Sequence, residues 1–343
     1  MSPVPPSQIR PVDALLARVA RAAAQDAVRI DAAINDFFLA EDDRLDDRVR
    51  ARMAALLAGS IERIEQAILA YAARQTGLPL SGGVHRRLTE SGLLRDHLLG
   101  EHLIGAARLA LMGEALAAGV PQSERSDLLV RLCSVRDGVV ASAASALLAA
   151  INRARSDGGD ALPPAVHARL VWWVAAALHE NAAGEAAARA LAEGATRSLD
   201  AHDEGSTVRA LANRLVAAID ARPAELGGLL IETLADARPL LFVAALAHAA
   251  RLAPADASAI LLDPADERLW VTLRALELDR ATIARIGLLL CESDPRRDVE
   301  AFAEQIDTIM AVDAGTAAAA LDLLRLPSEF RNAQRILAGS ARA

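Results

Sequence analysis

The amino-acid sequence predicts an all-α protein without a β-sheet. Alanine dominates the 343 residues, hydrophobic residues make up 53% and aromatic residues 3%. Small side chains favour helices that pack closely, whereas sheets are enriched in β-branched and aromatic residues. Apolar residues also recur at steps of three and four, the period of a helix that buries one face.

The chain is expected to start with a disordered, proline-rich segment at residues 1–10, followed by a long helical hairpin at residues 11–76. The hairpin's first helix is predicted from about Val12 to Ala40, and its second from about Asp46 to Gln75. A narrow apolar seam on the second helix suits a partner helix. The seam residues are Leu57, Ile61, Ile64, Ile68 and Tyr71. This seam serves either the first helix or a second copy of the chain, which makes a homodimer one alternative.

A repeat follows the hairpin. Pro79, Pro121 and Pro163 are 42 residues apart, and each stands where a helix should begin. The first helical turn tolerates a proline because its N–H would have no helical partner there. Repeats of about 40 residues built from helix pairs are typical of HEAT and armadillo arrays. The sequence therefore predicts helical hairpins stacked as a HEAT/armadillo-like α-solenoid.

The repeats divide into two regions, predicted at residues 77–155 and 164–343, with a linker at residues 156–163. The linker lies in "RARSDGGDALPP", where an Asp-Gly-Gly turn and a double proline interrupt the helical pattern. Beyond it, four short segments each contain a proline and at least one aspartate, a residue that often caps a helix. These segments are "DARPAEL", "DARPLL", "LAPADA" and "SDPRRD". Such combinations end one helix and begin the next.

The charged residues exclude several functions. The chain has no lysine, so a Schiff-base lysine, a P-loop lysine and a kinase strand lysine are all excluded. Its formal net charge of −8 argues against nucleic-acid binding, which rests on clustered positive charge. We expect no nucleic acid as a partner.

The remaining composition is typical of a cytoplasmic protein. Cys133 and Cys291 are far apart among apolar neighbours, which favours reduced, buried thiols over a disulfide or a metal site. The start, "MSPVPPSQIRPVD", lacks the apolar core of a secretory signal. The longest uncharged run, from Gly138 to Asn152, is too short for a membrane span, so no membrane association is expected.

One acidic stretch, "EDDRLDD" at residues 41–47, resembles a catalytic metal-binding motif. It contains Asp42-Asp43-x-x-Asp46, a string that helical prenyl-diphosphate enzymes use to hold Mg²⁺. That mechanism also needs a second acidic motif and an aromatic-lined cavity, and the sequence supplies neither clearly. The structural alternative is simpler: Asp42 or Asp43 caps the second long helix, the other acids favour its N-terminal dipole, and Asp46 pairs with Arg50 four residues later. We favour the capping interpretation, with an exposed corner at this point.

The histidines and tryptophans give weaker signals. His97 and Glu101 could align on one helix face, with His85 nearby, but His167, His202 and His248 stand alone and are expected to be packed or solvated. Adjacent residues on a helix point about 100° apart, so Trp172 or Trp173 could lie at the edge of the buried face. The favoured interpretation packs both tryptophans between repeats. If either is exposed, it is the first candidate for a protein-binding hot spot.

The longest family resemblance runs from Arg238 to Leu290, "RPLLFVAALAHAARLAPADASAILLDPADERLWVTLRALELDRATIARIGLLL". A helix that reaches Leu246, a Leu-Leu-Asp turn at residues 261–263 and a helix from Leu269 to Leu278 resemble the C-terminal portion of the bacterial family called domain of unknown function 2336. Residues 37–57 and 91–99 are similar to that family's early helix pair and its short link. The resemblance implies a HEAT-like helical protein, and it supplies no known activity or site.

These observations predict a non-enzymatic scaffold or regulator that binds a protein partner. We expect no catalytic residue, metal or cofactor, and an acidic concave surface would prefer a basic or amphipathic partner. The alternative is a Mg²⁺-dependent helical enzyme that acts on a diphosphate through Asp42, Asp43 and Asp46.

Overall fold

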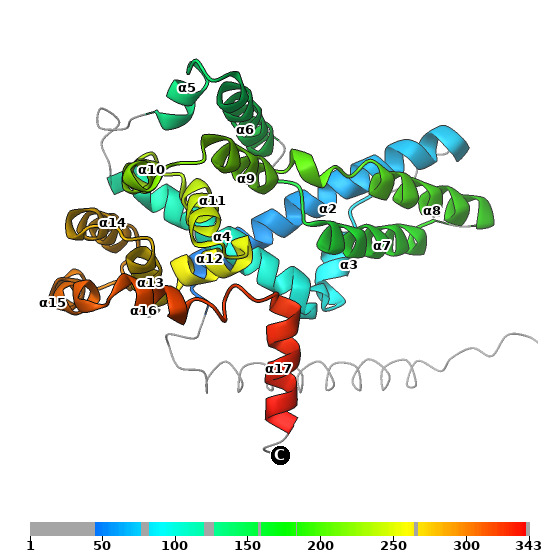
Figure 1. Cartoon of the computed structure of the whole chain (residues 1–343). Helices are drawn as coiled ribbons and strands as arrows, with labels where there is room; N and C mark the ends of the chain where they lie inside the picture. Colours follow the sequence, from blue (N-terminus) through cyan, green and yellow to red (C-terminus); the bar gives the residue numbers. More distant parts are fainter. Residues whose placement is uncertain are drawn as a thin grey trace, which may run out of the picture. The chain divides into compact units, whose positions relative to one another are not determined.

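The computed structural model describes residues 45–76, 82–119, 127–156, 159–182, 184–263 and 267–340 (Figure 1). All regular elements in these ranges are helices, so the all-α prediction is confirmed for the described part of the chain. The chain divides into two compact units, residues 1–50 and 51–343. The predicted disordered start and the predicted helix from Val12 to Ala40 lie outside the described residues.

Helix α2 (Asp47–Thr76) begins and ends within one residue of its predicted bounds. Its seam residues Leu57, Ile61, Ile64 and Ile68 are buried, each 5% exposed or less. Part of the seam packs against α8, because a Cβ added at Gly194 of α8 would lie 3.0 Å from the carbonyl oxygen of Ile68. A glycine at this contact lets the two helices approach closely.

Between α2 and α8 the chain alternates short and long helices. Helix α4 is central among them, since it contacts α7, α10, α11, α12 and α14. The elements of this part are α3 (His85–Glu90), η2 (Leu93–Arg95), α4 (His97–Gly119), α5 (Leu128–Leu132), α6 (Gly138–Ser156), α7 (Pro164–Glu180) and α8 (Glu185–Asp200).

Prolines start several helices, as the sequence predicts. Pro164, Pro223, Pro239 and Pro254 occupy the first turns of α7, α10, α11 and α12. Pro163 is the N-cap of α7, whereas Pro79 and Pro121 lie outside the described residues. The elements after α8 are η4 (Glu204–Ser206), α9 (Val208–Ile219), α10 (Pro223–Ala235), α11 (Pro239–Ala250), α12 (Pro254–Leu262), α13 (Arg268–Ala275), α14 (Arg280–Ser293), α15 (Val299–Ala311), α16 (Ala314–Ala320) and α17 (Ser328–Ser340).

The main hydrophobic core surrounds α11. Every residue from Leu241 to Ala247 is buried, and Phe242 is fully buried. A helix that is apolar on all sides is stable only where other helices cover it. Helices α4, α9, α10 and α12 contact α11 and provide that cover. Helices α7 and α8 pack mainly on each other, and α7 also contacts α3 and α4.

Within the described ranges, none of the helices combines the length and the apolar character that a membrane span requires.

Candidate functional site

The acidic stretch contributes a helix cap. The carboxylate of Asp46 accepts hydrogen bonds from the backbone N–H groups of Arg48 and Val49, the latter at 3.2 Å. An aspartate of the stretch therefore caps α2, as predicted, although this residue is Asp46 and the prediction named Asp42 or Asp43. Asp47 forms an exposed ion pair with Arg50 at 3.6 Å. Asp42 and Asp43 lie outside the described residues, so the magnesium alternative stays a prediction.

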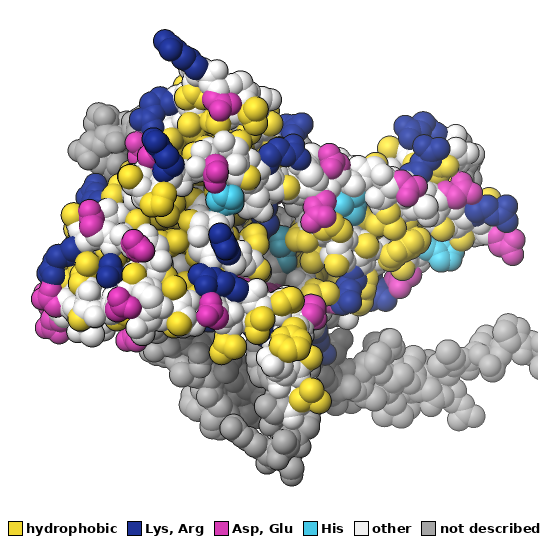
Figure 2. All heavy atoms as spheres, in the orientation of Figure 1, with side chains coloured by type: hydrophobic (Ala, Val, Ile, Leu, Met, Phe, Trp, Pro, Cys, Tyr) yellow, Lys and Arg dark blue, Asp and Glu magenta, His cyan; other side chains and the backbone are white. Residues whose placement is uncertain are grey.

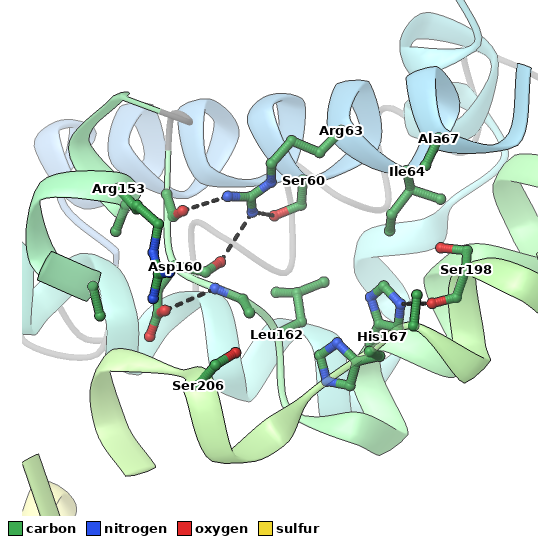
Figure 3. Close-up of a pocket in the computed structure, with 16 residues that line it drawn as sticks. Ser60, Arg63, Ile64, Ala67, Arg153, Asp160, Leu162, His167, Ser198 and Ser206 are labelled. Atoms are coloured by element: carbon green, nitrogen blue, oxygen red, sulfur yellow. Dashed lines mark hydrogen bonds between the residues drawn. The ribbon is translucent and has the colours of Figure 1, made fainter. Parts of the chain in front are cut away.

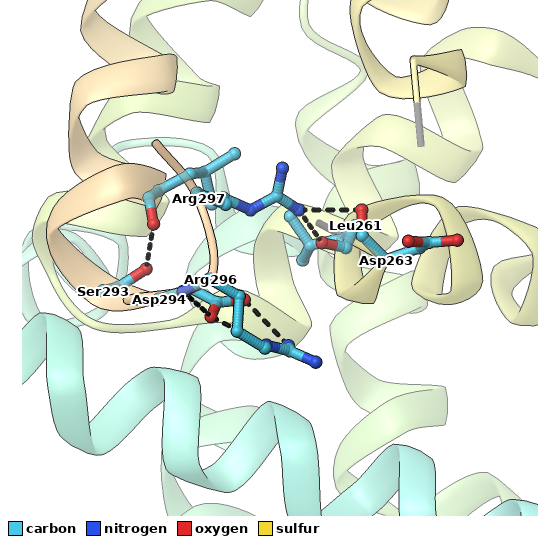
Figure 4. A network of polar contacts seen from close by, with 7 residues as sticks. Leu261, Asp263, Ser293, Asp294, Arg296 and Arg297 are labelled. Carbon is cyan, nitrogen blue, oxygen red and sulfur yellow. Dashed lines mark hydrogen bonds and ion pairs between the residues drawn. The ribbon is translucent and has the colours of Figure 1, made fainter. Parts of the chain in front are cut away.

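Two other acidic segments that could supply a second metal motif also have structural roles. Asp203 caps η4 by accepting the N–H of Gly205, and Asp298 caps α15 by accepting the N–H of Glu300. Asp294 forms a two-pronged ion pair with Arg296, at 2.8 and 2.9 Å (Figure 4). In the described part of the chain, no three His, Cys, Asp or Glu side chains gather closely enough to hold a metal ion.

Figure 4 also shows Arg297, whose guanidinium reaches across to the end of α12. One of its nitrogens donates to the carbonyl oxygens of Leu261 at 2.6 Å and Asp263 at 3.2 Å. These carbonyls belong to the last turn of a helix, where no helical N–H is left to pair with them. Arg297 is 8% exposed, so its role is to close a helix end inside the fold.

The two adjacent tryptophans lie on the surface of α7. Trp172 is 48% exposed and Trp173 is 38% exposed, so the interpretation that packs both between repeats is wrong. The physical reason is the width of the buried face, which is already filled by smaller side chains. Those buried residues of α7 are Val166, Leu170, Val171, Val174, Ala175, Ala177 and Leu178. At 100° per residue, Trp172 lies near the middle of the remaining exposed arc and Trp173 lies at one edge of it.

Ion pairs border one side of this arc. Arg169, one turn before Trp173, pairs with Asp96 just before α4. Glu180, near the end of α7, accepts two hydrogen bonds from Arg87 of α3, at 2.7 and 3.0 Å. The Arg87 guanidinium lowers the pKa of the Glu180 carboxyl below its usual value. Figure 2 shows hydrophobic side chains exposed along α7 between acidic and basic groups.

Small residues surround Trp172 on its own helix. Ala168 precedes it by one turn and is half-buried, and Ala176 follows it by one turn and is exposed. Alanine side chains are too short to cover the indole ring beside them. We call the surface formed by Trp172, Trp173, Ala168 and Ala176 the tryptophan face. Its large apolar area with a charged border is the arrangement found in protein-binding hot spots.

A second site, which the sequence did not indicate, is a pocket of about 350 Å³ between α2, α6, α7 and α8 (Figure 3). His167 of α7 and His202, which follows α8, stack in its wall with ring centroids 4.1 Å apart and planes 14° apart. The Nε2 atom of His167 lies 3.4 Å from the carbonyl oxygen of Ser198. Burial lowers the pKa of His167, and His202 and Arg63 lower it further.

Arg63 of α2 fixes the opposite wall. Its guanidinium donates to the carbonyl oxygens of Gly159 and Asp160, the latter at 2.9 Å, and approaches Ser60 Oγ at 3.4 Å. The Asp160 carboxylate accepts the N–H of Val208 at 3.1 Å and so caps α9. The segment predicted as a linker is therefore held at two points where the structure describes it.

No single signal in the sequence brings these pocket residues together. The two histidines are separated by the whole of α8, and Arg63 lies almost one hundred positions before its carbonyl partners. Only packing of α2, α7 and α8 aligns them. Cys133 and Cys291, in contrast, are both free thiols as expected, although each is half-buried rather than buried.

Comparison with known proteins gives one match. The family model described as an uncharacterised protein conserved in bacteria (DUF2336) matches residues 158–322. This range contains the segment from Arg238 to Leu290 on which the sequence resemblance rests, while residues 37–57 and 91–99 fall outside it. No curated protein and no solved structure matches the chain. The matched residues 158–322 carry Trp172, Trp173, both stacked histidines and the α11 core, and they are the part of the chain that is similar to the DUF2336 family of bacteria.

Proposed function

We propose that this chain is a non-enzymatic helical protein that binds a protein partner through the tryptophan face of α7. The observation that carries the proposal is the exposure of Trp172 and Trp173 on one helix, at 48% and 38%. Leaving two indole rings in water forgoes a large burial free energy that a partner can recover. Tryptophan is also among the residues most enriched at binding hot spots.

The surroundings of the face indicate the chemistry of the partner. The border residues Arg169 and Glu180 already have ion-pair partners, Asp96 and Arg87, within the chain. A partner therefore gains little from charges at this border, and an apolar side chain or the apolar face of a helix suits the surface best. The chain's net charge of −8 favours a basic or amphipathic partner at longer range.

The proposal has two further parts. The helix pairs stack as a HEAT/armadillo-like solenoid, and the protein is located in the cytoplasm. The 42-residue spacing of Pro79, Pro121 and Pro163 supports the stacking, and the similarity of residues 158–322 to a bacterial family is compatible with that location. A homodimer through residues 11–76 is a separate part of the proposal, and it uses a different surface.

The test replaces both tryptophans of the face and compares the result with replacement of two apolar residues elsewhere that are more exposed. The variant is W172A/W173A, and the matched control is V130A/V139A, whose valines are 56% and 70% exposed. The tagged full chain is used to capture partners from a lysate of the source bacterium, and the captured protein is purified for a binding titration. We expect the tryptophan variant to bind it about 30-fold more weakly or worse, since hot-spot truncations cost about 2 kcal/mol or more.

The control variant should bind like the unaltered chain. Equal binding by all three proteins contradicts the proposal. Urea unfolding of each variant checks the fold, and we expect midpoints close to that of the unaltered chain because all four positions are exposed.

A further inference from the structure

The pocket of Figure 3 adjoins a second hollow on the same side of α6. The second hollow has a volume of about 330 Å³ and is lined by residues of α6, η4 and α9. Both hollows share Arg153 and Ser206, so their walls are continuous. Each volume lies in the range of pockets that take small organic molecules, and neither is large enough for a nucleic acid duplex.

The charges of this double hollow are unlike those of the protein as a whole. Three arginines line it, Arg63, Arg153 and Arg214, against two aspartates, Asp160 and Asp203. The chain in total carries 37 basic and 45 acidic residues. The double hollow is therefore a locally cationic site in an acidic protein.

The carboxylates of the hollow are already engaged. Asp160 accepts the backbone N–H of Val208 at 3.1 Å, and Asp203 accepts the N–H of Gly205 at 2.9 Å. Each caps the start of a helix, a position where a carboxylate is stabilised by the helix dipole. The guanidinium of Arg63 is likewise engaged, because it donates to backbone carbonyls.

Two of the three arginines that line the double hollow are not engaged in this way. Within the described residues, neither Arg153 nor Arg214 has a hydrogen bond or an ion pair, although both line the second hollow. A guanidinium offers up to five N–H donors in a planar fork that matches phosphate oxygens. Two such groups without partners, around a concave surface, suit an anion with several oxygens.

An independent observation comes from the histidine pair. The Nε2 atom of His202 is buried and has no hydrogen-bond partner among the described residues, and His202 lines the first hollow. A buried polar atom without a partner destabilises a fold unless something satisfies it. A polar group brought into the hollow by a ligand can pair with this nitrogen.

We propose that the double hollow binds a small phosphorylated molecule, with Arg153 and Arg214 contacting the phosphate group and His202 contacting a polar group at the other end. The ligand class follows from the two fork-shaped donors, and the extended shape follows from the continuous walls. No residue of the tryptophan face lines the double hollow, so the two proposals can be tested separately.

The experiment is a calorimetric titration of the full chain at fixed ionic strength, with four probes. These are inorganic phosphate, pyrophosphate, adenosine 5′-monophosphate and unphosphorylated adenosine. We expect saturable binding of at least one phosphorylated probe and none of adenosine. Tighter binding of the nucleotide than of phosphate assigns the site to organic phosphates, and the reverse order assigns it to inorganic ones.

The test variant is Arg153→Gln with Arg214→Gln. We expect its affinity for the bound probe to fall about tenfold or more, about 1.4 kcal/mol, because the variant lacks the charged groups that donate to the phosphate. The matched control is Arg155→Gln with Arg285→Gln, which removes the same charge from exposed positions that do not line the hollow. Its affinity should stay within twofold of the unaltered chain, about 0.4 kcal/mol or less.

Three results would overturn the proposal. These are no saturable binding of any phosphorylated probe, equal weakening in the test and control variants, and binding of adenosine as tight as that of its monophosphate. The variant His202→Asn adds a second readout, because it should weaken the nucleotide but leave binding of inorganic phosphate unchanged.

Discussion

Arg297 shows how a single charged residue can serve the interior of a helical protein. Its guanidinium satisfies the carbonyl oxygens of Leu261 and Asp263 at the end of α12. Burial lowers the pKa of Arg297, and the neighbouring Asp294 opposes that shift. The residue stays charged at neutral pH because an arginine pKa is far above 7. Its burial is therefore tolerated because of the carbonyls and carboxylate around it.

Replacing this arginine should destabilise the protein. In Arg297→Ala the two carbonyls lose their donor while they stay inside the fold, and we expect the free energy of unfolding to fall by about 2–4 kcal/mol. Urea unfolding measures the change. Arg285→Ala is the matched control, because Arg285 lies on the exposed face of α14. A loss no larger than the control's would contradict the role given to Arg297.

His102 should make the stability depend on pH. Burial, with a smaller contribution from Arg209, lowers the pKa of His102 from 6.5 to about 4. The folded chain therefore keeps His102 neutral, while the unfolded chain binds a proton as the pH falls below about 6.5. Stability is full above pH 6.5 and is lost between pH 6.5 and pH 4. The expected loss between pH 7.5 and pH 5 is about 2 kcal/mol.

The check compares urea unfolding of the unaltered chain and His102→Gln at pH 7.5 and pH 5.0. The variant has no group to protonate at this position, so its stability should fall less over the same interval. Some loss should remain, because burial also lowers the pKa of His167. Identical losses in both proteins would show that His102 titrates normally.

At this scale the sequence predicted roles that depend on neighbours along the chain. A cap from the acidic stretch was expected because the partners of a cap are the next few backbone N–H groups, but the expected residue was Asp42 or Asp43, and the observed cap is Asp46. The exposure of Trp172 and Trp173 and the stacking of His167 on His202 depend on helices that are distant in sequence. Local periodicity cannot rank such alternatives, and for the tryptophans it favoured the wrong one.

At the scale of helices, two glycines with the same local context should respond in opposite ways to alanine. Gly228 in α10 is exposed, and a Cβ there would meet nothing within 4 Å. Gly287 in α14 faces α15, and a Cβ there would overlap the ring of Phe302. Helix propensity alone favours alanine at both positions.

We therefore expect Gly228→Ala to raise the free energy of unfolding by about 0.5–1 kcal/mol, because alanine loses less backbone entropy. Gly287→Ala should lower it by about 1–3 kcal/mol, because Phe302 must leave its position. Urea unfolding of both variants decides the matter. A Gly287→Ala variant as stable as the unaltered chain, or more stable, would mean that α14 and α15 are not packed as closely as the structure indicates.

The elements themselves were predictable where a local signal marks them. Proline in the first turn predicted the starts of α10, α11 and α12. The apolar seam predicted both ends of α2 to within one residue. The segment at 159–163 was predicted only as a linker, because a turn-rich composition says nothing about what holds it. Its anchors are Arg63 on α2 and Val208 at the start of α9, and both are distant in sequence.

At the scale of the whole molecule, the tryptophan face lies on a helix outside the main core, and the double hollow lies where core helices α6 and α9 approach α2, α7 and α8. The core cluster is formed by residues of α4 to α6 and α9 to α15, and it contains no residue of α2, α7 or α8 among those described. A helix outside the core cluster buries less of its surface within the chain, and the rest is accessible to a binding partner. Helix α7 carries the tryptophan face, and its His167 also lines the first hollow, so this helix contributes to both of the sites proposed above.

Fluorescence can test the exposed state of the tryptophan face in solution. The chain has three tryptophans, and Trp270 is 8% exposed and packs against Phe302 with ring centroids 4.7 Å apart. In W172F/W173F only Trp270 emits, so we expect a blue-shifted spectrum and weak quenching by acrylamide. In W270F the two exposed tryptophans emit, and quenching should be strong because each is more than a third exposed.

The way in which acrylamide quenching depends on protein concentration distinguishes two surfaces through which copies of the chain could associate. A homodimer whose contact consists only of residues 11–76 buries neither indole, so quenching of W270F should not change on dilution even if sedimentation velocity detects dimers. Association through the tryptophan face would instead protect both indoles at high concentration, and dilution would restore quenching. That second pattern would mean that the face binds another copy of this chain, and it would contradict a partner of a different kind.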